Sequence, residues 1–423
     1  MHHFHYEGDA LYCERVPVRE IAREVGTPCY VYSCATLRHH FTVFDGAFQG
    51  MPHLTCYSAK ANANLAILGL FAALGGGADI VSGGELFRAR HAGIAADRIV
   101  YSGVGKTQTE IDYALRENIL MFNIESTQEL EAIDHRASIL NSKARIALRV
   151  NPDVDPKTHP YISTGLKKNK FGIDIDHALK AYARARDLEH VEVLGIDCHI
   201  GSQLTEVAPF VEALKRLKAL IRCLEEMGIA IRYMDLGGGL GISYHEETPP
   251  HPREYAQAVV EELGDLRCTL ILEPGRVIVG NAGILLTQVL YTKKTPSKEF
   301  MIVDAGMNDL VRPSLYGSYH HIQPIERTER ESRIVDVVGP ICESSDFIAR
   351  ERDLPAMQPG EFLAVMSAGA YGFSMASNYN ARVRAAEVMV KDDEFYITRE
   401  RESWSDLIRG ESIPEFAKGA SHP

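Results

Sequence analysis

The sequence predicts an α/β fold: a (β/α)8 barrel of the TIM type followed by a C-terminal β-rich domain. Short apolar, β-branched runs alternate with longer stretches of helical periodicity from about residue 54 to 275. There are about eight such runs, the number that closes a parallel barrel within roughly 250 residues, whereas an open doubly wound sheet normally uses fewer strands. The runs are Leu54–Ser58, Ala78–Val81, Ile99–Ser102, Leu120–Ile124, Arg145–Val150, Val193–His199, Tyr233–Leu236 and Leu270–Leu272.

After Gly280 the pattern changes to strand-like runs without long helices, which indicates a separate β domain. We therefore predict a barrel over residues 46–280 and a β domain over residues 281–423. The apolar segment Cys29–Tyr32 precedes the first barrel strand, so residues 1–45 are expected to return and pack with the β domain. The stretch from 151 to 172 lacks periodicity and is expected to form a long loop at the end of a barrel strand.

Composition and charge exclude several classes of function. The 423 residues are 45% hydrophobic and 24% charged, as in ordinary globular proteins, and the net charge of −12 would repel a nucleic acid backbone. No apolar run approaches the length of a membrane span, and no secretion signal is evident, so we expect a cytoplasmic protein. The eight cysteines form no CxxC pair and are expected to be reduced thiols.

Reactive residues of a βα barrel lie where the strands end, on the carboxyl-terminal face. Lys60 follows the first predicted strand and precedes an apolar helix. At the barrel mouth the pKa of a lysine can fall, and its amine can become a Schiff-base nucleophile. A surface lysine at a strand end would give the same pattern, so Lys60 alone does not decide between the two.

A run of glycines and a histidine follow two later strands. The contiguous Gly237, Gly238 and Gly239 offer amides for a phosphate group, although glycines also mark tight turns and their spacing is not that of a dinucleotide fingerprint. His199 ends another strand. A lone histidine is more often a core residue, but beside a phosphate site its ring could lie on a flat heteroaromatic cofactor.

Glu273 and Arg276 follow the eighth run. A buried carboxylate against a pyridine nitrogen keeps that nitrogen protonated and makes the ring a strong electron sink, while a structural ion pair is the alternative. Together the lysine, the histidine, the glycine run and the carboxylate supply what pyridoxal 5'-phosphate (PLP) needs.

A metal-dependent aldolase or hydrolase would need His, Asp or Glu ligands at several strand ends. Only His199 with scattered carboxylates occurs there, and we expect no metal; the His2, His3 and His5 cluster is interpreted as adventitious.

The motifs resemble the alanine-racemase-like barrel enzymes that use PLP, and within them the decarboxylases of basic amino acids, most of all the diaminopimelate decarboxylase family. The resemblance extends over essentially the whole chain. Its motifs are Tyr57–Asn62, Gly77–Ser82, Asn151–Asp153, His159–Gly165, Lys170–Gly172, His199–Gln203, Asp235–Gly239, Glu273–Arg276, Cys342–Ser344 and Gly369–Tyr371.

The resemblance implies a role for each site residue. Lys60 would form the Schiff base with the cofactor, Asp79 would neighbour its nitrogen, and His199 would stack on the ring. Glu273 would meet the pyridine nitrogen, where the racemase branch has an arginine. The rest of the cofactor would be held by Ser202, Gly237, Gly238, Gly239, Gly275, Arg276 and Tyr371.

The family also implies an obligate head-to-tail homodimer with active sites completed across the interface. Cys342 resembles the residue that the partner chain donates to protonate the reacting carbon, although free cysteines are commonly buried and inert. Its position directly before Glu343 favours the catalytic interpretation.

Substrate choice depends on the distal end of the substrate. Glu343 suits a distal ammonium group, while Arg276, Arg312 and Tyr316 suit a distal carboxylate. Tyr371 is also expected to bind the substrate. The resemblance therefore implies decarboxylation of meso-diaminopimelate at its D-configured centre, giving L-lysine and carbon dioxide in the last step of lysine biosynthesis. Ornithine, arginine or carboxynorspermidine remains an alternative substrate. A catalytically silent PLP-binding regulator is a weaker alternative, because such proteins typically lose the lysine or the cysteine.

Overall fold

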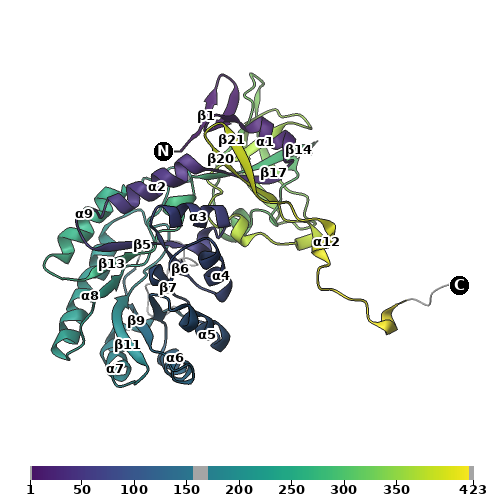
Figure 1. Cartoon of the computed structure of the whole chain (residues 1–423). Coiled ribbons are helices and arrows are strands. Elements are labelled where there is room, and N and C mark those ends of the chain that lie inside the picture. Colours follow the sequence, from purple (N-terminus) through teal and green to yellow (C-terminus); the bar gives the residue numbers. More distant parts are fainter. Residues whose placement is uncertain (1, 156–169, 419–423) are drawn as a thin grey trace.

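The first half of the chain closes into a parallel barrel in the computed structural model, which describes residues 2–155 and 170–418 (Figure 1). Each strand pairs in parallel with the next one along the chain, and β13 returns to β5 to complete the ring. The predicted (β/α)8 barrel is confirmed. Its strands are β5 (His53–Ser58), β6 (Gly77–Ile80), β7 (Ile99–Tyr101), β8 (Met121–Ile124), β9 (Ala144–Asn151), β11 (Val191–Asp197), β12 (Tyr233–Asp235) and β13 (Thr269–Leu272).

Helices surround this barrel, as Figure 1 shows. Local signals start several of them: the Ser82 and Ser126 side chains cap two N-termini, and Thr107 with Glu110 forms a capping box. Apolar residues at helical spacing turn one face of each helix toward the strands. The helices are α3 (Leu65–Ala73), α4 (Gly83–His91), α5 (Gln108–Glu117), α6 (Thr127–Ile139), α7 (Ile175–Arg186), α8 (Ala208–Glu226), α9 (Pro252–Leu263) and the short α10 (Arg276–Val279).

The second half of the chain forms a β-rich domain, as predicted. Its main sheet has the order β18-β17-β15-β14-β4-β20-β21, with β19 beside β14 and β16 beside β19. These strands are β14 (Gly283–Lys294), β15 (Glu299–Val303), β16 (Ile322–Pro324), β17 (Ser332–Val338), β18 (Phe347–Pro355), β19 (Phe362–Val365), β20 (Ala386–Lys391) and β21 (Glu394–Arg399).

The N-terminal segment joins the two parts. Strand β4 (Cys29–Ser33) lies between β14 and β20 in the domain's sheet, as the sequence predicts. Helix α2 (Cys34–Gly46) instead contacts α3, α9 and α10 of the barrel, because its face of Leu37, Phe41 and Phe44 is apolar and buried. The same segment therefore fixes the β domain against the barrel, and the boundaries near residues 45 and 280 remain our proposal.

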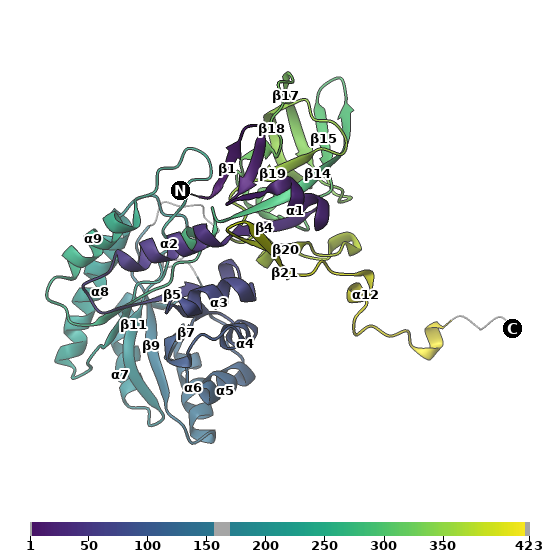
Figure 2. The same cartoon turned by 45° about the horizontal axis from the view of Figure 1, so that its top comes forward.

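Shorter elements complete the chain. The N-terminal strands β1 (Phe4–Glu7), β2 (Ala10–Cys13) and β3 (Val16–Pro17) form a small sheet that precedes α1 (Val18–Glu24). Strand β10 (Ile173–Asp174) pairs with the end of β9, and the predicted loop motif at His159–Gly165 lies outside the described residues. After β21 the chain runs through α12 (Trp404–Leu407) and away from the body of the molecule (Figure 2). None of the described helices is long and apolar enough to cross a membrane.

Candidate active site

Several of the predicted site residues line one cavity, whose walls come from both the barrel and the β domain. Asp79, Glu273 and the glycines 237–239 and 275 are not among the residues that line it. Its volume is about 510 Å³, and its walls come from the ends of β5, β11 and β12, from α10, and from α11 (Arg312–Tyr316) of the β domain. Among the residues predicted from the sequence, those lining it are Lys60, His199, Ser202, Arg276, Arg312, Tyr316 and Tyr371. The barrel thus supplies one wall and the β domain the opposite one.

Lys60 lies directly after β5, and its Nζ donates a hydrogen bond to Oδ2 of Asp79 on β6 at 2.7 Å. The same oxygen accepts the hydroxyl hydrogen of Ser58 at 2.6 Å, while Oδ1 of Asp79 is buried and has no partner among the described residues. Burial lowers the pKa of Lys60, but the charges of Asp79 and Glu273 outweigh burial and the net result is a raised pKa. The expectation of a lowered lysine pKa is therefore wrong for the chain alone, because two carboxylates flank the amine.

His199 is held by the glycine run. Its Nδ1 accepts the backbone N–H of Gly238 at 3.2 Å. Burial and the charges of Arg149 and Lys60 lower the pKa of His199 well below its usual range, so the ring is neutral. Gly237 has φ +64° and lies so close that an added Cβ would stand 2.6 Å from Nδ1 of His199.

The three glycine amides have different partners. Gly237 donates to Oδ1 of Asp235 at 2.9 Å, and Gly238 donates to His199. Gly239 donates to no recorded acceptor in the part of the chain that the structure describes. Close packing thus explains much of the glycine run, and the Gly239 amide is the one left for a phosphate oxygen.

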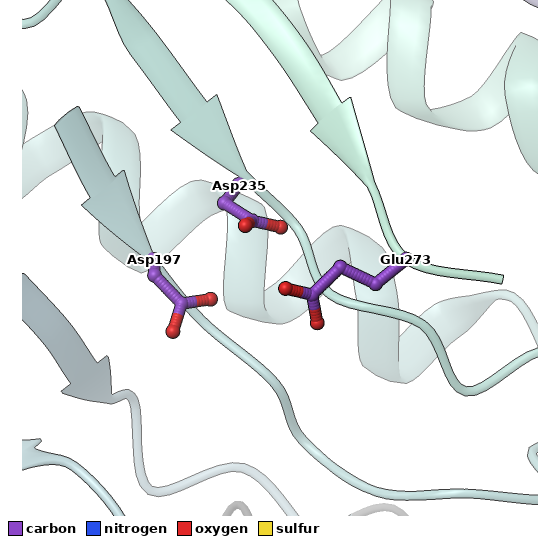
Figure 3. Close-up of side chains that lie close together, drawn as sticks. All are labelled: Asp197, Asp235 and Glu273. Atoms are coloured by element: carbon purple, nitrogen blue, oxygen red, sulfur yellow. The ribbon is translucent and has the colours of Figure 1, made fainter. Parts of the chain in front are cut away.

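Three buried carboxylates converge at the ends of neighbouring barrel strands: Asp197 from β11, Asp235 from β12 and Glu273 after β13 (Figure 3). One oxygen of each lies within 4.8 Å of the others. Burial and mutual repulsion raise the pKa of Asp197 and Glu273 well above their usual range, and burial raises that of Asp235 to about 6. The sequence shows these carboxylates as scattered, but the adjacent strand order β11-β12-β13 brings them together.

This acidic cluster is partly compensated from its sides. Nε of Arg149 lies 3.9 Å from Asp197, and Nδ2 of Asn123 donates to Asp235 at 3.1 Å. Ser102 donates to Glu273 at 3.4 Å. Glu273 therefore occupies a site where its charge is costly, which suits a carboxyl group that shares a proton with a basic nitrogen.

Two arginines form the opposite end of the cavity. Arg276 donates to Ser202 Oγ at 3.0 Å, and Arg312 donates to Ser318 Oγ at 3.1 Å. Both also donate to the phenol oxygen of Tyr244, a residue that the sequence reasoning missed. Neither makes an ion pair with a carboxylate in residues 2–155 and 170–418, so this end of the cavity is suited to an anion.

Cys342 and Glu343 do not line the cavity of their own chain. Both are exposed in the loop after β17, where the Cys342 N–H donates to Oδ1 of Asn380 at 2.9 Å. Glu343 accepts hydrogen bonds from Ser345 and, at 2.7 Å, from the hydroxyl of Tyr379. A single chain therefore does not bring this predicted pair to Lys60.

The residues present fit PLP on structural grounds. Lys60 offers an amine, His199 a neutral ring, and Glu273 a carboxyl group with a raised pKa. The unpartnered Oδ1 of Asp79, the Gly239 amide and the Arg276 guanidinium are the polar groups that a phosphorylated heteroaromatic ligand would satisfy.

Comparison with known proteins agrees with this chemistry. The family model described as pyridoxal-dependent decarboxylase, pyridoxal binding domain, matches residues 34–280. The chain is 51% identical over 404 residues to diaminopimelate decarboxylase of Aquifex aeolicus, covering 95% of this chain and 96% of that one. It is 52% identical over 410 residues to the Pseudomonas aeruginosa protein of that name, covering 97% and 99%.

A solved structure extends the likeness to three dimensions. Diaminopimelate decarboxylase of M. jannaschii, in co-complex with L-lysine, superposes with a TM-score of 0.94 at 41% identity and covers 98% of this chain and 99% of that one. By sequence and by fold, the chain belongs to the diaminopimelate decarboxylase family of pyridoxal-dependent decarboxylases.

Proposed function

We propose that this chain is a carboxy-lyase that removes carbon dioxide from the D-configured centre of meso-diaminopimelate to give L-lysine. One observation carries the proposal: the Lys60 amine and the arginine pair Arg276 and Arg312 line the same cavity. The amine suits a carbonyl cofactor, and the arginines suit a carboxylate far from the reacting centre.

When bound, PLP supplies the sink for the electron pair left on the α-carbon as carbon dioxide departs. Lys60 would provide the amine for the cofactor aldehyde, and Asp79, which accepts a hydrogen bond from that amine at 2.7 Å in the free chain, would stay beside the nitrogen. His199 would support the cofactor ring as a neutral imidazole, and Glu273 would help to keep the pyridine nitrogen protonated. Ser202, Gly239, Gly275 and Tyr371 would hold the phosphate region together with Arg276.

The distal end of the substrate distinguishes the candidate reactions. Arg312, Arg276 and Tyr316 would bind a distal carboxylate, which ornithine and arginine lack. Glu343 would bind the distal ammonium group. The arginine pair therefore favours meso-diaminopimelate over the other basic amino acids.

The exposed position of Cys342 and Glu343 supports a homodimer in which a second chain brings both residues to the cavity. Cys342 of that chain would deliver a proton to the carbon that has lost its carboxylate. All eight cysteines are free thiols, as in a reducing compartment, which supports the cytoplasm as the place of action.

The test is carbon dioxide release by the PLP-loaded protein from meso-diaminopimelate, L-ornithine, L-arginine and carboxynorspermidine, assayed side by side. We expect turnover of meso-diaminopimelate with L-lysine as product. Turnover of another substrate alone would refute the assignment of Arg312 and Glu343. Turnover of none would favour a silent PLP-binding regulator.

A further inference from the structure

Tyr244 lies at the centre of the anion-binding end of the cavity. Its phenol oxygen accepts one hydrogen bond from Nη1 of Arg276 and one from Nη1 of Arg312, each at 2.7 Å. The three side chains are buried and come from the loop after β12, from α10 and from α11. One phenol thus joins a guanidinium group of the barrel to a guanidinium group of the β domain.

Two guanidinium groups that contact the same oxygen atom carry like charges and repel each other, and the acceptor between them reduces this repulsion. A phenol oxygen has two lone pairs and one hydrogen, and the arginines use both lone pairs. Within the described residues Tyr244 is recorded only as an acceptor through this oxygen. The hydroxyl hydrogen therefore stays available to an oxygen of a bound anion.

We propose that Tyr244 is a positioning residue for the anion-binding end of the cavity. It aligns Arg276 and Arg312 for one carboxylate and thereby sets the affinity of the cavity for that carboxylate. The inference deepens the proposed function, since the anion is taken to be the distal carboxylate of the substrate.

The surroundings of Tyr244 predict how the affinity of the arginine pair for an anion changes with pH. Burial raises the pKa of Tyr244, but Arg276 and Arg312 outweigh burial, and the net pKa is below its usual value. An anion on the arginines removes the support that they give to a phenolate, so binding favours the protonated phenol. Affinity for the anion should therefore fall as pH rises through the Tyr244 pKa.

Other groups that face Tyr244 do not reverse this sign. His320 meets the ring edge-on at 5.4 Å, and burial lowers its pKa to about 3, so it stays neutral. Glu247 accepts the Tyr244 backbone N–H at 2.9 Å, and its own pKa is lowered, so it is charged throughout the range. Tyr371 contacts Arg276 through its ring, 4.9 Å from the guanidinium carbon.

The test compares Tyr244→Phe with Tyr182→Phe in the PLP-loaded protein. Tyr182 is a control, because it is also a buried tyrosine and its hydroxyl donates to the backbone oxygen of Gly195 at 2.9 Å, away from the cavity. The probe is pimelate, a dicarboxylate without amino groups, with its Kd measured by calorimetry from pH 7 to 10. Steady-state rates with meso-diaminopimelate are measured in parallel.

We expect Tyr244→Phe to raise the pimelate Kd and the substrate KM about tenfold, with kcat within about threefold of wild type. It should also abolish the loss of pimelate affinity at high pH, whereas Tyr182→Phe should keep the wild-type Kd and pH profile. Unchanged Kd and KM in Tyr244→Phe would overturn the proposal. So would a loss of kcat at constant KM, which would assign Tyr244 to the chemical step.

Two further outcomes are separable. If Tyr244→Phe does not fold, proton uptake on pimelate binding is measured with the wild type at pH 9 in buffers of different ionisation enthalpy, and no uptake would refute the proposal. If the wild type turns over no meso-diaminopimelate while Tyr244→Phe still weakens pimelate binding, the proposed function fails and the role of Tyr244 stands.

Discussion

The cavity and the Cys342–Glu343 loop carry residues of the same proposed reaction, but the chain holds them in different ways. In the cavity, Lys60 and His199 have close polar partners and strongly shifted pKa values. Cys342 and Glu343 are exposed, and their recorded partners Asn380 and Tyr379 lie on the same surface. In the proposed homodimer, one chain would thus supply the cofactor and carboxylate end of the site, while the second chain would supply the proton donor and the ammonium end.

The largest expected effect comes from the cavity side. Lys60→Ala should lower kcat on the order of 10⁴-fold, because it removes the amine that joins the cofactor. The visible absorption band of the bound cofactor should disappear as well. Lys60→Arg is the matched control: it keeps a cation beside Asp79 but cannot join an aldehyde, so it should be equally inactive. A normal visible spectrum in purified Lys60→Ala would remove Lys60 from the site.

A substitution in the Cys342–Glu343 loop should lower kcat less than Lys60→Ala does and should leave the cofactor bound. Cys342→Ala should keep the cofactor band yet lower kcat about 10² to 10³-fold, because a positioned proton donor contributes roughly that much. Cys223→Ala is the control, since Cys223 is also an exposed thiol but lies on α8.

Mixing the two inactive variants tests the comparison directly. In a mixed dimer of Lys60→Ala and Cys342→Ala, one of the two sites would receive both native residues. If chains exchange at random, half of the dimers are mixed, and about one quarter of wild-type activity should return. No recovery after verified chain exchange would place Cys342 and Lys60 in the same chain's site and contradict the shared arrangement.

A substitution in the acidic cluster should change the free energy of unfolding, whereas one in the exposed loop should not. Glu273→Gln should lower kcat about 10²-fold, yet stabilise the cofactor-free protein by about 1–3 kcal/mol near pH 8. The pKa of Glu273 is raised by burial and by Asp235, so its ionisation opposes folding as pH rises above its unfolded value of about 4.5.

Urea unfolding at pH 5 and pH 8 checks this sign. The stabilisation by Glu273→Gln should be larger at pH 8, where the unfolded carboxyl group is ionised while burial and Asp235 oppose ionisation of the native one. Glu343→Gln is the control, because Glu343 is exposed and its replacement should leave the free energy of unfolding unchanged at both pH values. A pH-independent difference for Glu273→Gln would mean that repulsion in the cluster is already relieved.

Features that depend on local sequence were predicted, whereas features that depend on contacts between distant elements were not. The eight barrel strands follow from local periodicity, and Lys60 and His199 follow from lying at strand ends. The acidic cluster was missed because it depends on which strands are neighbours, not on spacing along the chain. Tyr244 was missed because its role exists only where the barrel meets the β domain.

Edge strands of the β domain were missed for a related reason. The sequence predicts strand-like runs that correspond to β14, β15, β17, β19 and β20, but it does not predict the edge strands β16, β18 and β21. The raised pKa of Lys60 likewise depends on Asp79 and Glu273, which lie on other strands. Local pattern predicts elements, whereas charge interactions between elements require the folded arrangement.

The smallest effect should come from Tyr379→Phe, which removes the 2.7 Å hydrogen bond to Glu343. An exposed hydrogen bond contributes little to folding, so the free energy of unfolding should stay that of the wild type. If a second chain buries Glu343 against the substrate, the same bond orients a desolvated carboxylate, and KM should rise about three- to tenfold. Tyr396→Phe is the matched control, because Tyr396 is an exposed tyrosine that donates to Glu394 on β21.

The measurements are the steady-state KM and the urea unfolding of both variants. Equal KM values would mean that the loop acts without Tyr379, and a KM change confined to Tyr379→Phe would mark the surface that the second chain covers.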